Sequence, residues 1–255
     1  METEHSMEIE IRNLSYQTGG RQILHNVSSV FRGPGICGII GPNGCGKTTL
    51  LRHIYRELNG AGHVFLNGKD VHAFSGRVFS RHMAVMMQHQ NIVEKDLRVR
   101  DIVCMGRYPY KNLVGRYNLE DQKIVDEILA KTGLEPFQNR RVDSLSGGEM
   151  QRVMIAKCFA QQPDIIVLDE PANHLDVRYK VELMKMLRDF PGLVIMTLHD
   201  LNLAAEYCTR LYLMDQGTIL LEGGAQEVLQ EEMLQKVFQT PIRVFHTPYG
   251  TFTSV

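Results

Sequence analysis

The sequence predicts an α/β fold in which helices flank a mostly parallel sheet. Three runs, 36–40, 165–168 and 193–198, are almost continuously apolar, which is the pattern of strands buried on both faces of a parallel sheet. Helical patterns follow the first two of these runs. The chain has 255 residues and 44% of them are hydrophobic, so it can bury a sizeable core.

The first part of the chain predicts antiparallel strands. Ile9 and Ile11 alternate with charged residues, which is the period of a strand with one buried face. A Gly19-Gly20 turn then leads to a second apolar stretch at 27–31. We therefore expect an antiparallel β portion at the N-terminus.

The helical patterns lie at 47–58, 177–190 and 119–131, and the last ends at a Thr-Gly pair, a common helix stop. Residues 89–144 contain helical patterns but no apolar strand run. We therefore place a helical insertion there, and we expect a final extended piece after Pro241.

Composition restricts the class of partner. The 28 basic and 29 acidic residues give a formal net charge of -1, so no broad basic surface for nucleic acid is expected. The 5 cysteines form no CxxC pair and fit neither a disulfide framework nor a zinc site, which favours a reducing cytoplasm. The first residues do not resemble a signal peptide, and no apolar run approaches the roughly 18 residues of a membrane helix. Any membrane role is expected to use a partner.

Residues 41–48 match the phosphate-loop pattern GxxxxGK[ST], directly after an apolar run and directly before a helical pattern. Its glycines let the backbone wrap closely, so that N–H groups and the following helix N-terminus can face phosphate oxygens. We expect Lys47 to reach the β and γ phosphates and Thr48 to hold Mg²⁺. A glycine-rich turn with a chance lysine is the alternative, which the flanking strand and helix disfavour. The residues predicted to bind nucleotide here are Gly41, Pro42, Asn43, Gly44, Cys45, Gly46, Lys47, Thr48 and Thr49.

Two carboxylates follow the apolar run 165–168, at the end of a strand where open α/β sheets bind ligands. Asp169 is expected to orient Mg²⁺, and Glu170 to polarise the attacking water of a phosphoryl transfer. A lone Asp-Glu pair could equally be a polar strand end that enters a turn at Pro171.

The octapeptide 145–152 reads LSGGEMQR. Taken locally it is a helix start, with Ser146 as the N-cap and Glu149 completing a capping box. Two glycines in a first helical turn cost roughly 1 kcal/mol each, so close approach of another group to the backbone is expected there. A helix N-terminus bared by glycines is also an anion site.

This octapeptide resembles the LSGGQ-type signature of the ATP-binding cassette (ABC) family, with Glu149 where Gln is the more familiar residue. The resemblance covers about residues 7–240 and implies a P-loop NTPase core. In that family the signature of one subunit closes over the γ-phosphate held by the phosphate loop of another. Ser146, Gly147, Gly148 and Glu149 would therefore act in trans, within an ATP-bound homodimer.

Other family positions follow in order. Tyr16 matches the aromatic residue that stacks on adenine, Gln88 the glutamine that contacts Mg²⁺ and water, Asp176 the acid that couples the two subunits, and His199 the switch histidine at the γ-phosphate. Singly, they would be a surface aromatic, a solvated strand end, a helix-start residue and a strand-end histidine; their joint order favours the family roles. The resemblance implies catalysis by Glu170, His199, Lys47 and Gln88, and Mg²⁺ binding by Thr48, Gln88 and Asp169.

We predict one nucleotide-binding domain spanning residues 1–255. Its ATP-binding core, including the antiparallel portion, is placed at 7–88 and 159–240. The helical signature subdomain is placed at 89–158 and a C-terminal extension at 241–255.

Cys45 departs from the family pattern, where a small residue such as Ser or Ala is usual. Because backbone N–H groups hold the phosphates, binding should survive, and a small filler is the simpler role for Cys45. A thiol beside a helix N-terminus and Lys47 is nevertheless expected to have a lowered pKa. An alkylating reagent should then inactivate the protein, and MgATP should protect it.

Three stretches, 105–110 (MGRYPY), 169–176 (DEPANHLD) and 198–204 (LHDLNLA), look like ATPases of the iron(III)-siderophore, haem and cobalamin uptake group. For the segment around Pro109, a helix end with packed tyrosines is the alternative to a partner contact.

This resemblance implies an ATP-hydrolysing subunit that powers an importer from the cytoplasmic face of the cell membrane. Integral-membrane permease subunits would lie on other chains, and an extracellular or periplasmic binding protein would act indirectly. A soluble cassette ATPase without a permease, such as an iron–sulfur assembly scaffold, is the alternative. A catalytically silent nucleotide sensor is disfavoured, because the catalytic residue types are all present.

Overall fold

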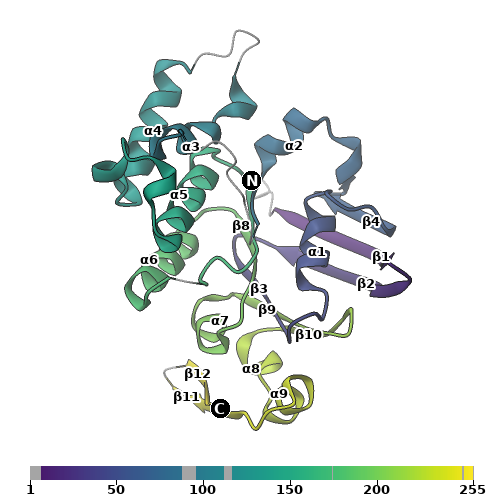
Figure 1. The fold of residues 1–255 in the computed structure, drawn as a ribbon. Coiled ribbons are helices and arrows are strands. Elements are labelled where there is room, and N and C mark those ends of the chain that lie inside the picture. The colour runs from purple at the N-terminus through teal and green to yellow at the C-terminus, as the bar shows by residue number, and fades with distance from the viewer. Residues whose placement is uncertain (1–6, 88–95, 112–116, 174, 249, 255) are drawn as a thin grey trace, which may run out of the picture.

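The computed structural model describes residues 7–87, 96–111, 117–173, 175–248 and 250–254 (Figure 1). In chain order the elements are β1 (Glu8–Thr18), β2 (Arg21–Arg32), β3 (Gly35–Ile40), α1 (Lys47–Ile54), β4 (Ala61–Leu66), β5 (Lys69–Asp70), η1 (Val71–Ala73), α2 (Gly76–His82), β6 (Met83–Met86), α3 (Val99–Met105), η2 (Tyr108–Tyr110), α4 (Leu119–Lys131), η3 (Glu135–Phe137), η4 (Val142–Ser144), α5 (Gly147–Ala160), β7 (Ile165–Leu168), α6 (Val177–Arg188), β8 (Leu193–Thr197), α7 (Leu201–Tyr207), β9 (Arg210–Asp215), β10 (Thr218–Gly223), α8 (Ala225–Val228), α9 (Glu231–Phe238), β11 (Arg243–Thr247) and β12 (Gly250–Ser254).

The central sheet has the strand order β10-β9-β3-β8-β7-β6. All neighbours pair in parallel except β10, which is an antiparallel edge strand on β9. The three apolar runs form β3, β7 and β8, which are adjacent, so the predicted parallel sheet is confirmed. β6, β9 and β10 of this sheet were not predicted, because periodicity alone does not distinguish a strand from a helix in such short segments.

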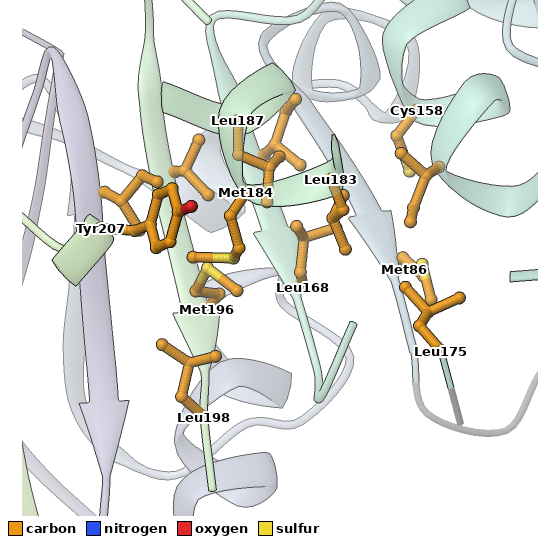
Figure 2. Close-up of a cluster of buried hydrophobic side chains, with 14 of the residues drawn as sticks. Met86, Cys158, Leu168, Leu175, Leu183, Met184, Leu187, Met196, Leu198 and Tyr207 are labelled. Atoms are coloured by element: carbon orange, nitrogen blue, oxygen red, sulfur yellow. The ribbon is translucent and has the colours of Figure 1, made fainter. Parts of the chain in front are cut away.

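The two faces of this sheet are covered differently. Along β3, Ile36 and Ile40 join a core with helices α5, α6 and α7, whereas Cys37 and Ile39 join a second core with α1 and the antiparallel sheet. Figure 2 shows the first core, where Met196 of β8 packs beside side chains of α6. Helices therefore flank one face as predicted, and the other face carries α1, α2 and a second sheet.

The second sheet has the order β2-β1-β4-β5. β1 and β2 form an antiparallel hairpin in which Ile9 lies opposite Phe31, and Gly19 and Gly20 form its turn. The predicted antiparallel portion at the N-terminus is thus confirmed. Its buried side chains, including Ile11, pack with Leu50 of α1 in the second core.

The chain between β6 and β7 forms helices α3, α4 and α5, and in its described residues, 96–111 and 117–164, no named strand occurs. The predicted helical insertion is therefore present. α4 has the predicted limits, with Asn118 as a side-chain cap. α5 continues to Ala160, two residues past the placed boundary at 158. The boundaries of the domains remain a prediction.

Two helices end earlier than predicted, each for a local reason. α1 ends at Ile54 instead of 58, because Arg56 has a left-handed backbone with φ of 55°. α6 ends at Arg188 instead of 190, because residue Phe190 precedes Pro191 and the helical conformation is disfavoured there.

The C-terminal extension forms the hairpin β11–β12, which agrees with the extended piece expected after Pro241. The hairpin is held to α7 by Asn202, whose side chain accepts from Thr253 N at 2.7 Å. Among the described helices, none is long and apolar enough to cross a membrane.

Candidate functional site

The carboxyl ends of β3, β7 and β8 open into one cleft of about 830 Å³. Three adjacent parallel strands end at the same edge of the sheet, so the segments that follow them come together there. The described residues that line the cleft are Arg21, Ile23, Asn43, Gly44, Gly46, Lys47, Thr48, Thr49, Glu170, Asn173 and His199. The fold therefore unites the phosphate loop, the predicted general base and the predicted switch histidine.

The phosphate loop requires its first glycine. A Cβ on Gly41 would lie 2.1 Å from the carbonyl oxygen of Met214, so no side chain fits there. Lys47 is only 6% exposed, and its Nζ donates to the carbonyls of Gly41 at 2.8 Å and Pro42 at 3.0 Å. These acceptors are uncharged and an ammonium has three donors, so the charge of Lys47 is not neutralised by them and can attract phosphate.

Helix α1 begins at Lys47 and presents its first turn to the cleft. Gly46, the N-cap, has φ of 110° and carries no side chain that could cap the helix. Gly46, Lys47, Thr48 and Thr49 all line the cleft. The uncapped N–H groups and the positive end of the helix dipole therefore form an anion site.

Glu170 is held by two neighbours in the cleft. His199 Nε2 lies 2.5 Å from Glu170 Oε1, and Asn173 Nδ2 donates to Glu170 Oε2. Glu170 also has a left-handed backbone with φ of 53°, an uncommon conformation for a residue with a side chain. The carboxylate is thus oriented by its backbone and by both oxygens. No motif in the sequence predicted a role for Asn173.

Thr197, at the end of β8, connects the two carboxylate residues. Its Oγ1 donates to Asp169 Oδ1 at 2.7 Å and accepts from Glu170 N at 2.8 Å. Asp169 is 3% exposed and Thr197 is fully buried. No pattern in the sequence marks Thr197, because it is an ordinary polar residue at the end of an apolar run.

The oxygen donors of two predicted site residues fit the chemistry of Mg²⁺. The carboxylate of Asp169 and the hydroxyl of Thr48 are ligands of the kind that this ion takes, together with water and substrate phosphates. Among the described residues, no group of three or more His, Cys, Asp and Glu side chains could hold a metal by itself. A magnesium ion here would take water and the phosphates of the nucleotide as further ligands.

The signature segment forms the start of α5 as predicted. Ser146 Oγ accepts from Glu149 N at 3.3 Å, and Glu149 Oε2 accepts from Ser146 N at 2.8 Å. The bond from the Ser146 backbone holds the pKa of Glu149 below its usual range. The predicted capping box is confirmed. A Cβ added to Gly147 would meet no described atom within 4 Å, so contacts within the described chain do not explain this glycine.

Gln151 links this helix to the general base. It is 9% exposed, and its Nε2 donates to the carbonyl of Pro171 at 2.5 Å and to that of Glu170 at 3.4 Å. The signature helix is therefore bonded to the backbone that carries Glu170. The octapeptide that contains Gln151 was identified from the sequence, but this bond joins residues 20 apart and was not foreseen.

Some residues predicted to bind nucleotide or Mg²⁺ are not among the described residues that line the cleft, namely Gly41, Pro42, Cys45 and Asp169. Tyr16, Asp176 and Gln88 are three further predicted site residues outside that set. Tyr16 packs edge-on against His53, with ring centroids 4.8 Å apart, and is outside the set of described residues that line the cleft. Asp176 is the N-cap of α6 and accepts from Tyr179 N at 2.9 Å. Gln88 lies outside the described residues. The family roles of these three residues remain predictions.

The expectation that Cys45 has a lowered pKa is wrong. Cys45 is 5% exposed, and burial raises the pKa of its thiol above the ordinary value of 9.0. Lys47 acts in the opposite direction, but its effect is smaller than that of burial. Desolvation penalises the thiolate more than the nearby charge stabilises it.

Arg107, in the MGRYPY stretch, has an internal role. It is 4% exposed, pairs with Asp121 of α4 at 2.9 Å, and donates to the carbonyl of Ala160 in α5 at 2.8 Å. The packing interpretation therefore holds for Arg107. Tyr108 beside it is 53% exposed.

Together these features define a nucleotide-binding α/β protein with a phosphate loop, an oriented carboxylate and a histidine in one cleft. The sequence profile of the ABC transporter family matches residues 24–173, which is more than half of the chain. This chain belongs to the ABC transporter family, in its class of ATP-binding ATPase subunits.

Curated relatives resemble the chain over nearly its whole length. It is 36% identical to the petrobactin import ATP-binding protein FpuC of Bacillus anthracis, over 93% of this chain and 89% of that one. It is 34% identical to the iron(3+)-hydroxamate import ATP-binding protein FhuC of Bacillus subtilis, over 96% and 91%. It is also 36% identical to the cobalamin import ATP-binding protein BtuD of Halobacterium salinarum, over 95% and 61%.

The fold has a close match among solved structures. The ADP conformation of MJ1267, an ATP-binding cassette of an ABC transporter, superposes with a TM-score of 0.79 at 24% identity, over 91% of this chain and 97% of that one. This likeness concerns the fold alone.

Proposed function

We propose that this chain binds and hydrolyses ATP to power a membrane importer of an iron(III)-siderophore or a related metal chelate, such as haem or cobalamin. The observation that carries the proposal is the convergence of Lys47, Glu170 and His199 on one cleft in a chain of this family. The relatives described above have import in their names, which favours the importer over a soluble assembly ATPase.

ATP binding follows from the geometry of the loop. The N–H groups at the start of α1 and the ammonium of Lys47 would hold the β and γ phosphates. Thr48, Asp169 and Gln88 would hold Mg²⁺, which neutralises charge on the phosphates when it is bound. Tyr16 would stack on the adenine, as the family resemblance implies.

Hydrolysis uses the carboxylate that the cleft orients. Glu170 accepts a proton from the attacking water, while His199 and Asn173 hold the carboxylate in place. His199 then also contacts the γ-phosphate. Lys47 and the helix N-terminus stabilise the charge that develops on the transferred group.

We place the complete site between two copies of the chain. Ser146, Gly147, Gly148 and Glu149 would close over the nucleotide of the partner copy, with Asp176 coupling the two. The open space around Gly147 supports such an approach, because a bare backbone there can meet a phosphate. ATP would thus join the two subunits, and hydrolysis would release them.

The proposed partners are integral-membrane permease subunits and, indirectly, an extracellular or periplasmic substrate-binding protein. The chain would lie at the cytoplasmic face of the membrane through the permease, with no nucleic acid involved. FpuC and BtuD are equally identical to this chain although their names give different cargoes. The cargo is therefore proposed as a class of metal chelates.

The first test is a pull-down of the tagged chain from native membranes in mild detergent, followed by mass spectrometry. We expect a polytopic permease, whose reconstituted complex should hydrolyse ATP faster with its loaded binding protein. Lys47→Ala should abolish nucleotide binding and this stimulated activity. Recovery of a wholly soluble complex under all salt and nucleotide conditions would overturn the importer in favour of the assembly ATPase.

A further inference from the structure

Helix α2 fastens the helical insertion to the core. It leads directly into β6 of the central sheet, so it belongs to the core. Arg77 Nε donates to the carbonyl of Pro109 at 3.0 Å, and Arg77 also donates to the carbonyl of Lys111. Arg81 Nε donates to the same Pro109 carbonyl at 3.1 Å. Two arginines of the core thus hold the η2 turn of the insertion.

The end of the insertion is attached to the same helix. Gln161, the residue at the C-terminal end of α5, donates from Nε2 to the carbonyl of Ser80 at 2.5 Å and to that of Met83 at 2.7 Å. Both carbonyls belong to the C-terminal end of α2. α2 is therefore held by an early and a late part of the insertion at once.

The contact continues into the body of the insertion. The ring of Tyr110 lies against two guanidinium groups, 4.1 Å from that of Arg107 and 5.1 Å from that of Arg81. Arg107 is buried and pairs with Asp121 of α4, and it also binds the Ala160 carbonyl of α5. A continuous set of contacts therefore joins α2 and η2 to the signature helix.

We infer that Arg77 and Arg81 are positioning residues that set the orientation of α5, and with it Ser146, relative to the phosphate loop. This inference rests on the proposed function, in which Ser146 closes over the nucleotide of a partner copy. In such a dimer the phosphate loop and the signature of each copy must meet their counterparts at the same time. The relative placement of core and insertion then determines how tightly the dimer closes.

The test compares dimer formation with nucleotide binding by the monomer. In a Glu170→Gln chain, the double substitution Arg77→Ala/Arg81→Ala should raise the dissociation constant of the ATP-dependent dimer by about tenfold, as expected when backbone carbonyls lose their charged donors. Sedimentation equilibrium measures this constant. The affinity of the dilute monomer for a fluorescent ATP analogue should stay unchanged. Arg77→Lys/Arg81→Lys keeps one donor group at each position and should retain most of the dimer affinity of the parent chain.

Arg56 provides a matched control, because it makes the same kind of contact inside the core. Its Nη1 donates to the carbonyl of Phe74 at 2.7 Å, and its guanidinium lies 4.2 Å from the ring of Phe79. Arg56→Ala should lower thermal stability and leave the dimer constant unchanged. If the double variant and its parent have the same dissociation constant for the dimer, the inference is overturned. It is also overturned if Arg56→Ala raises this constant as much as the double substitution does.

The inference can be separated from the proposed function. If the Glu170→Gln parent itself stays monomeric with ATP, the sandwich dimer is wrong. The positioning role is then decided by the distance between spin labels at Leu119→Cys on α4 and Leu220→Cys on β10, both exposed, with Cys104 and Cys208 replaced by Ala. The double arginine variant should broaden the distance distribution, and an unchanged distribution overturns the inference.

Discussion

His199 Nε2 lies 2.5 Å from Glu170 Oε1, so the histidine after β8 directly contacts the carboxylate after β7. These strands are parallel neighbours, and Leu168 pairs with Met196 at their ends. Glu170 follows Leu168 by two residues and His199 follows Met196 by three, and the side chains of Glu170 and His199 meet. The contact therefore depends on the register of two strands that are separated by a helix in the chain.

Removing this contact should impair hydrolysis more than binding. We expect His199→Ala to lower kcat by about 10²-fold, the size of a typical general acid–base contribution, with a much smaller change in KM. Release of phosphate under steady-state conditions measures both. His199→Gln keeps a donor near Glu170 and should retain more activity than the alanine variant. A raised KM with an unchanged kcat would show that His199 acts mainly in binding.

Gln151 should affect the chemical step through the backbone of Glu170. Gln151→Met keeps a similar shape but removes the bonds to the Glu170 and Pro171 carbonyls, and we expect kcat to fall by about tenfold, which corresponds to a loss of about 1.4 kcal/mol. ATP binding to the monomer should be unchanged. Gln235→Met is a matched control, because Gln235 Nε2 donates to the Ile242 carbonyl at 2.8 Å, at a part-buried position near the C-terminus. A similar loss in both variants would contradict this role for Gln151.

The buried ion pair of Arg107 and Asp121 should matter for stability. Arg107→Met leaves the Asp121 carboxylate buried without its cation, and we expect the free energy of unfolding to fall by about 3 kcal/mol. Urea unfolding measures the change. Arg178→Ala breaks an exposed pair with Glu182 and should leave the free energy of unfolding almost unchanged. The double variant Arg107→Met/Asp121→Asn should be more stable than Arg107→Met, because its residue 121 is uncharged. If the two variants have the same free energy of unfolding, the loss comes from packing and not from the unpaired charge.

Cys45 should react slowly with alkylating reagents. Burial raises the pKa of its thiol, so the thiolate fraction at pH 7.5 is small, and iodoacetamide should modify it at least about tenfold more slowly than an unhindered cysteine. The rate should rise as the pH rises, because only the thiolate reacts. Peptide mass spectrometry of the folded chain, with the urea-unfolded chain as the reference, measures the rate. Rapid labelling of folded Cys45 at pH 7.5 would instead support the lowered thiol pKa that was expected from the sequence.

His53 should make stability depend on pH. It is 2% exposed, burial lowers its pKa, and its Nε2 has no partner among the described residues. A histidine that binds protons more weakly when folded favours the unfolded state as the pH falls below about 6.5. His53→Phe keeps the ring beside Tyr16 and should flatten the fall in unfolding free energy between about pH 6.5 and 5.

Urea titrations of the His53→Phe chain at several pH values test this expectation. His25→Gln, at an exposed position, serves as the control and should leave the slope as in the parent chain. If His53→Phe and the parent lose stability equally over this range, His53 is not the group responsible.

Much of the fold could be predicted because its signals are local. Continuous apolar runs marked β3, β7 and β8, and the spacing of Gly41, Lys47 and Thr48 marked the phosphate loop. The capping box of Ser146 was also readable, since a cap involves residues three positions apart. β6 is as short as β7, but its Met and Ala residues favour a helix as readily as a strand, so it gave no clear signal.

The sequence by itself thus determined the phosphate loop, the carboxylates, the signature helix and the layered α/β class, because each depends on residues that are neighbours in the chain. Only the tertiary structure decided that Thr197 joins Asp169 to Glu170, that Gln151 binds the backbone beside the base, and that burial outweighs Lys47 at Cys45. These outcomes depend on strand order, register and desolvation. Such properties arise when distant segments pack together, and no local pattern of residues encodes them.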